Sequence, residues 1–224
     1  MKRVSLVGTV HAEAGFASVY ELLAILERIK PEVIFLEIPS AAFDDYFTGT
    51  RGGLESSAVR RYREIHNVDL VPVDLPTPEP DFFKNSQDLH ERIEKRSPEY
   101  CRLMDCHSQN VRAYGFAYLN SEHCSTHWSK LREAMLTAIE EVADRGLAEL
   151  YELWVATNEH RDKEMMKRIG EYCRKTSFSK GAFLVGAAHR QSIIDKARGQ
   201  RGAVSATIQW DLAGFLTTNL DTVR

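Results

Sequence analysis

The stretch Leu6-Val7-Gly8-Thr9-Val10-His11 near the start of the chain recurs as Leu184-Val185-Gly186-Ala187-Ala188-His189 near its end. In both copies a short apolar run ends in glycine, and a histidine follows three residues later. Glycine lets the backbone turn sharply and approach a neighbouring group closely. The repeat therefore predicts two equivalent strands, each followed by a tight turn that carries a histidine and leads into a helix.

Strand-like and helix-like patterns alternate through the first third of the chain. Ser18 precedes the first helical stretch and Glu21 follows three residues later, a spacing that predicts a capping box. Because single strands alternate with single helices, we expect a parallel sheet with right-handed crossovers. The predicted strands are 3–8, 33–38 and 68–73, and the predicted helices are 18–30 and 54–66.

The alternation stops at residues 76–80, which hold three of the seven prolines. From 81 to 176 only helical periodicity is found, for example in the stripe Leu131, Met135 and Ile139. Strand pattern resumes at 182–186, before a helix at 191–198 and a last apolar run at 203–209. The predicted fold is α/β: a mostly parallel sheet built from 1–80 and 177–224, with a large helical insertion, 81–176, covering the carboxyl edge of the strands as a lid.

The composition is that of an ordinary soluble globular protein. The 224 residues are 43% apolar and 27% charged, with a net charge of −3. This balance argues against nucleic-acid binding and against an anionic membrane surface, since both need surplus positive charge. No apolar run is long enough to predict a membrane span. The four cysteines form no C-x-x-C pair, so we expect reduced thiols and a cytoplasmic protein.

Four polar residues lie at or just beyond the carboxyl ends of the predicted strands, the edge where parallel sheets bind ligands. They are His11, Glu37, Asp74 and His189. Imidazole and carboxylate together favour a divalent cation such as manganese, cobalt or zinc. Such a cation acidifies a bound water, and Glu13, two residues from His11, is placed to take the proton. The alternative is that each G-x-x-H is only a turn before a helix.

The motifs GTVHAE, IFLEIP and FLVGAAH, taken in this order, resemble the TraB/PrgY family. That family is related to the Tiki proteases and more distantly to erythromycin esterase and the haem-binding ChaN proteins. Its hallmarks are two G-x-x-H motifs, a strand-end glutamate and a helical arginine before the second motif. The resemblance maps these onto His11, Glu37, Arg161 and His189, with Arg161 in the stretch Asn158–Met165. The alternative for Arg161 is a solvated helix face.

The resemblance implies a metal-dependent hydrolase that cleaves a peptide, amide or ester bond in a peptide or small-molecule substrate. His11, Glu37 and His189 are the expected metal ligands. Glu13 or Asp74 is the expected general base, and Arg161 is expected to hold a substrate anion. The runner-up is a non-catalytic ligand-binding protein, with haem as one ligand, and a third option is an interaction module whose site has decayed.

A second pair of histidines lies in the predicted insertion. His123 and His127 lie four residues apart, on one face of a predicted helix, but lack the glutamate of an H-E-x-x-H site. They either bind a metal or line the surface or the lid. The oligomeric state is not fixed by the sequence, and a homo-oligomer is compatible with it.

Overall fold

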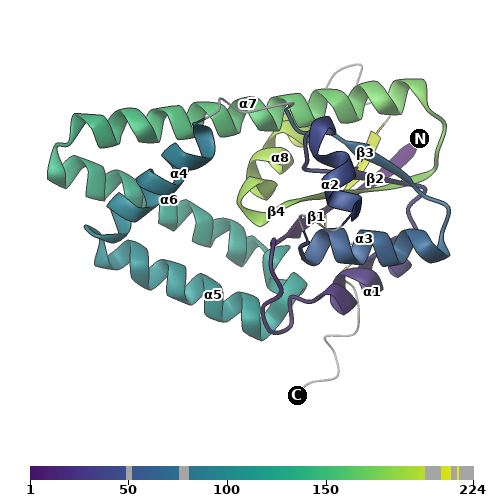
Figure 1. Ribbon diagram of the computed structural model, residues 1–224, viewed down its shortest axis with the longest axis horizontal. Helices are drawn as coiled ribbons and strands as arrows, with labels where there is room; N and C mark the ends of the chain where they lie inside the picture. The colour runs from purple at the N-terminus through teal and green to yellow at the C-terminus, as the bar shows by residue number, and fades with distance from the viewer. Residues whose placement is uncertain (49–51, 76–80, 200–207, 213–215, 217–224) are drawn as a thin grey trace.

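The computed structural model describes residues 1–48, 52–75, 81–199, 208–212 and 216. Within this part of the chain, five parallel strands form one sheet in the order β3-β2-β4-β1-β5 (Figure 1). The strands are β1 (Lys2–Thr9), β2 (Val33–Leu36), β3 (Asp69–Pro72), β4 (Lys180–Gly186) and β5 (Ile208–Asp211). The prediction of an α/β fold with a parallel sheet is confirmed.

The two copies of the repeat lie side by side. β1 pairs with β4, and the register sets Gly8 opposite Val185 and Thr9 opposite Gly186. β2 flanks β4 on its other side. The carboxyl ends of β1, β4 and β2 therefore meet at one edge, which brings residues from the two ends of the chain together.

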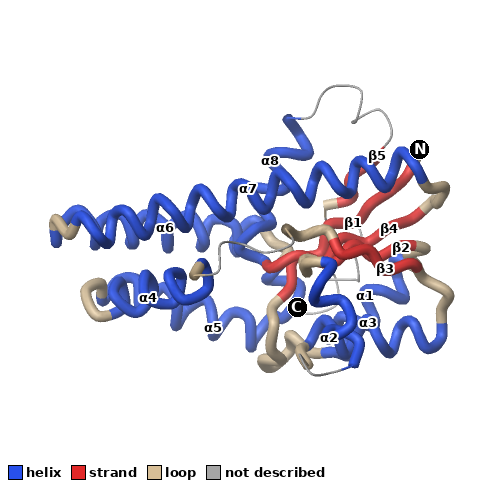
Figure 2. The backbone as a smooth tube through the Cα atoms, turned by 45° about the horizontal axis from the view of Figure 1, so that its top comes forward, coloured by secondary structure: helices blue, strands red, loops and turns tan. Residues whose placement is uncertain are grey.

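Helices cover both faces of the sheet, because successive residues of each strand point to opposite faces. Figure 2 shows the sheet between α7 and the pair α1 and α3. On one face α1 (Val19–Ile29) and α3 (Leu54–Ile65) pack against Val7, Ile34 and Leu184. On the other face α7 (Arg145–Lys175) and α8 (Ala187–Gly199) pack against Leu6, Phe35 and Phe183.

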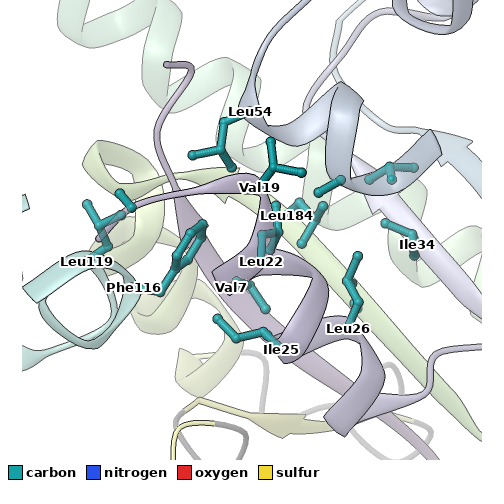
Figure 3. Packing of buried hydrophobic residues seen from close by; sticks show 14 of the residues in the cluster. Val7, Val19, Leu22, Ile25, Leu26, Ile34, Leu54, Phe116, Leu119 and Leu184 are labelled. Carbon is teal, nitrogen blue, oxygen red and sulfur yellow. The ribbon is translucent and has the colours of Figure 1, made fainter. Parts of the chain in front are cut away.

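The first helix shows how local sequence makes this packing. Figure 3 shows Leu22, Ile25 and Leu26 of α1 against the strand residues Val7, Ile34 and Leu184. The Ser18 hydroxyl accepts a hydrogen bond from the Glu21 backbone N–H at 3.2 Å, as the capping pattern predicts. The second hydrogen bond of the predicted capping box, from the Ser18 N–H to the Glu21 side chain, is not the one observed. The Glu21 carboxylate instead accepts a hydrogen bond from the Phe116 N–H at 3.1 Å.

The segment 81–176 is helical and holds no strand, as predicted. It contains α4 (Phe82–Glu94), α5 (Pro98–Leu119), α6 (Glu122–Val142) and the long α7. Its outer part has a core of its own around Leu89, Ile93 and Leu131. In Figure 1 α4, α5 and α6 lie at the opposite end of the sheet from the N-terminus, where β1 starts. α7 extends from this outer part to the sheet, where Met165 and Ile169 pack.

Several elements differ from the prediction. A 3₁₀ turn (η1, Ser40–Ala42) and a short helix α2 (Phe43–Thr48) follow β2, where no helix was expected. α8 begins at Ala187 rather than at Gln191, so His189 lies in its first turn. Of the predicted strand 203–209, residues 203–207 lie outside the described residues, and β5 covers 208–211. Among the helices described, none combines the length and the apolar character needed to cross a membrane.

Candidate functional site

A cavity of about 450 Å³ opens at the carboxyl edge of the sheet. Its lining includes His11, Glu37, Asp74 and His189, which come after the ends of β1, β2, β3 and β4, together with Arg161 from the middle of α7. Each helix of the insertion also contributes to the wall: Phe83 from α4, His107 from α5, Trp128 from α6 and Arg161 from α7. The cavity is therefore built jointly by the sheet edge and the insertion.

Arg161 is the centre of the charged side of this cavity. Its Nη2 donates to Glu37 Oε1 at 2.7 Å and to Asp74 Oδ2 at 2.8 Å. Its Nε donates to Asp74 Oδ1 at 3.2 Å, and its Nη1 donates to Asn158 Oδ1 at 3.2 Å. The side chain is only 10% exposed, so the alternative of a solvated helix face is wrong.

These contacts correct two expected roles. All three guanidinium nitrogens of Arg161 already face protein partners, so the geometry favours organising Glu37 and Asp74 over holding a substrate anion. Asp74 Oδ1 also accepts the Leu75 N–H at 2.8 Å, which leaves both Asp74 oxygens engaged. A carboxylate bound in this way is poorly placed to act as a general base.

His189 is held by a carboxylate on each side of its ring. Nδ1 lies 2.7 Å from Asp162 Oδ1, and Nε2 lies 3.3 Å from Glu37 Oε1. Nε2 is also 3.4 Å from Nη1 of Arg161. Burial opposes the charged form of His189, but the Glu37 and Asp162 carboxylates outweigh it and raise the pKa of the imidazole.

Glu37 is fixed to the second motif through the backbone. Its Oε2 accepts the Gly186 N–H at 2.6 Å. A Cβ added to Gly186 would lie 3.3 Å from that same oxygen, so glycine permits the close approach. Burial raises the pKa of Glu37, yet the charges of His189 and Arg161 and the Gly186 hydrogen bond together bring it below its usual value.

The first motif is positioned differently from the second. Gly8 donates its N–H to Asn120 Oδ1 at 2.6 Å, and Asn120 Nδ2 donates to the Gly8 carbonyl at 3.0 Å. Among the described residues β5 pairs with β1 as far as Ser5, and beyond that point the Asn120 amide pairs with the Gly8 backbone as a neighbouring strand would. A Cβ at Gly8 would lie 3.0 Å from the Leu119 carbonyl oxygen, which explains the glycine.

His11 follows in an exposed loop that the backbone of α3 anchors. The His11 carbonyl accepts the Leu54 N–H at 2.9 Å. Glu13 is the one predicted site residue absent from the cavity lining. Its carboxylate accepts the Val19 N–H at 2.8 Å, at the start of α1. The expectation that Glu13 is the general base is therefore corrected: in this structure its carboxylate stabilises the N-terminus of a helix.

Three side chains near the cavity were not singled out from the sequence. Asp162 holds His189, Asn120 holds Gly8, and Glu55 of α3 is hydrogen-bonded to the Thr9 hydroxyl. Burial raises the pKa of Glu55 to about 7. Only Asp162 had a local signal, because it adjoins Arg161 on the same helix; the other two contacts join residues 46 and 112 positions apart.

The charge of the cluster tests whether a divalent cation fits. Glu37, Asp74 and Asp162 are three carboxylates against the single guanidinium of Arg161, which leaves a surplus of two negative charges when His189 is neutral. Buried charge of this kind needs compensation. A divalent cation would supply it fully, and a proton on His189 would supply half of it.

The ligand geometry fits a cation in part. Glu37 Oε1 and His189 Nε2 are 3.3 Å apart, close to the separation of about 3.4 Å expected for two ligands of one tetrahedral zinc. Asp162 on Nδ1 is the outer-shell partner that metal-binding histidines usually have. His11 lines the same cavity, but no three His, Cys, Asp or Glu side chains of the described residues form a ready metal site.

The second histidine cluster is a packing feature of the insertion. His127 is buried and its Nε2 lies 2.8 Å from the Leu103 carbonyl oxygen. His107 Nδ1 lies 3.0 Å from the Tyr118 hydroxyl, and burial with the neighbouring His127 lowers the pKa of His107 to about 4. The rings of His123 and His127 are 6.5 Å apart. These contacts favour the lid-lining interpretation of the pair over metal binding.

Comparison with known proteins adds no assignment to this geometry. The chain matches no protein-family model, no curated protein and no solved structure.

Proposed function

We propose that the chain is a metal-dependent hydrolase of a peptide, amide or ester bond, as the resemblance to the TraB/PrgY family implies. The observation that carries the proposal is the convergence of His11, Glu37, Arg161 and His189 on one cavity. These four residues come from β1, β2, α7 and α8, or from the turns that follow the strands. They are the same four that the family motifs single out.

Glu37 and His189 are the first two ligands in this proposal, and His11 is the third. The cation would polarise the substrate carbonyl and stabilise the charge that develops on its oxygen. Asp162 holds the His189 ring with Nε2 toward the cavity, and Arg161 holds Glu37 against Asp74. The wall of the insertion, including Phe83 and Trp128, shields the reacting groups from water.

Metal analysis with a hydrolysis screen tests the proposal. The purified protein is loaded with manganese, cobalt or zinc, dialysed, and assayed on peptides, amides and esters before and after chelation. We expect about one bound cation per chain and hydrolysis that chelation removes. His189→Ala should lose both, whereas His160→Ala, an exposed histidine of the same region on α7, should keep both.

Asp162→Asn gives a graded version of the same test. Removing the outer-shell carboxylate should weaken cation affinity by about 10–100-fold while the ligands remain. If activity survives chelation, hydrolysis does not depend on the metal, and acid–base catalysis by His189 and Asp162 takes its place as the mechanism.

A non-catalytic ligand-binding protein is the second candidate, favoured by the apolar side of the cavity at Ile38, Phe83 and Trp128. Stoichiometric haem binding, with no hydrolysis of any substrate and no bound cation, would establish it in place of the hydrolase.

A further inference from the structure

A second cavity, of about 210 Å³, adjoins the first. It lies between the loop that carries His11 and the middle of α5, and it shares Val10 and His107 with the first cavity. A ligand that fills the first cavity can therefore extend past these two residues into the second. Its other lining residues include Ala12 and Ala14 from the loop and Ser108 and Arg112 from α5.

Arg112 provides the charge of the second cavity. Ser108 and Arg112 both line this cavity, lie one helical turn apart on α5 and are exposed, so their polar side chains are accessible to a ligand that enters it. No residue in the lining carries a carboxylate. Arg112 forms no ion pair and no side-chain hydrogen bond with any other residue that the structure describes.

The neighbouring titratable groups do not neutralise the charge of Arg112. Glu13, the acidic residue of the loop, is bound to the Val19 N–H. His107, at the boundary between the cavities, is neutral near pH 7 because burial and His127 lower its pKa to about 4. The two cavities thus differ in charge: the first holds a surplus of carboxylates and the second a single guanidinium.

We propose that the second cavity binds a carboxylate carried by the substrate and that Arg112 recognises it. This inference rests on the proposed function and names its substrate class: a peptide or an N-acyl amino acid whose free carboxylate lies a short distance from the scissile bond. A guanidinium pairs with a carboxylate through parallel N–H donors. Pairing with Arg112 sets the direction in which the substrate binds, with its free carboxylate in the second cavity and its scissile bond in the first.

Isothermal titration with two matched probes tests the proposal. Hippurate carries an aromatic ring, an amide and a free carboxylate, and hippuramide differs only in that the carboxylate is an amide. We expect wild-type protein to bind hippurate about tenfold more tightly, the value of one charge-assisted contact. The preference should shrink as salt is added.

Arg112→Gln should remove the preference by weakening hippurate alone. Arg102→Gln is the matched control, because Arg102 is an exposed arginine of the same helix that pairs with Glu99 and lines neither cavity. Equal binding of the two probes, no binding of hippurate at millimolar concentration, or a preference that survives Arg112→Gln would overturn the proposal.

The readout separates this inference from the proposed function. Since binding is measured directly, an Arg112-dependent preference in a protein that hydrolyses nothing overturns the hydrolase and supports the subsite. Hydrolysis with no preference for the free carboxylate, in rate or in binding, overturns the subsite alone.

Discussion

Asn120→Ala probes the contact by which the insertion holds the first G-x-x-H motif. The Asn120 side chain is buried and makes three hydrogen bonds, two with the backbone of Gly8 and one to the Phe116 carbonyl at 3.0 Å. The Phe116 carbonyl keeps a partner after substitution, because the Asn120 backbone N–H also donates to it at 3.1 Å. The Gly8 N–H and carbonyl lose theirs.

The expected cost follows from these two orphaned groups. A buried polar group left without a partner costs about 1–3 kcal/mol, so we expect unfolding free energy to fall by about 3 kcal/mol in total. For a chain of this size that corresponds to a drop in Tm of about 6–12 °C. Cation affinity should fall as well, because the loop that carries His11 starts at the released strand end.

Urea unfolding followed by circular dichroism measures the stability change. Gln109→Ala, an exposed substitution on α5, the helix that Asn120 caps, should change stability by less than about 0.5 kcal/mol. A loss below about 1 kcal/mol for Asn120→Ala would show that water or a rearranged backbone pairs with the Gly8 N–H and carbonyl instead. The Asn120 side chain would then not be what positions the first G-x-x-H motif.

Two further substitutions test a buried carboxyl on α3 and a glycine in α5. Burial raises the pKa of Glu55 to about 7, so the folded protein favours the protonated carboxyl. The contribution of Glu55 to the unfolding free energy is therefore complete below about pH 4.5, and about 3 kcal/mol is lost as pH rises through about 7. Glu55→Gln should flatten this part of the pH dependence in urea unfolding, and Glu64→Gln on the same helix should not; parallel curves for wild type and Glu55→Gln would contradict the assignment. Gly115 has a φ of 51°, and an added Cβ would lie 2.8 Å from the backbone of Phe16. Gly115→Ala should therefore lower the unfolding free energy by more than about 1 kcal/mol, whereas Gly146→Ala, whose nearest neighbour would be at 3.5 Å, should be neutral or slightly stabilising.

The elements of the fold were predictable because their signals are local. The apolar run around Leu6 and the run around Leu184 became the paired strands β1 and β4, and the stripe Leu131, Met135 and Ile139 became the buried face of α6. The short turn and helix at residues 40–48 were missed, because so short a segment carries no hydrophobic period. The start of α8 was placed too late, because helix termini have a weaker pattern than helix interiors.

The candidate site was predicted residue by residue but not in its connections. His11, Glu37, Asp74, Arg161 and His189 do line one cavity. Their roles depended on contacts that spacing does not encode. The position of Glu13 two residues after His11 predicted a general base, and only the tertiary structure shows its carboxylate bound at the start of α1.

The sequence by itself determined the strands, the longer helices and the polar residues at strand ends, since these follow from periods of two and 3.6 residues along the chain. The tertiary structure alone decided the strand order, which sets the second G-x-x-H motif beside the first and beside Glu37. It also decided that Asp162 holds His189, that Asn120 pairs with the backbone of Gly8 at the end of β1, and that Arg112 lines a second cavity. The physical reason is that hydrogen bonds and charges act over a few ångströms of space, and only packing brings residues separated by more than a hundred positions within that distance.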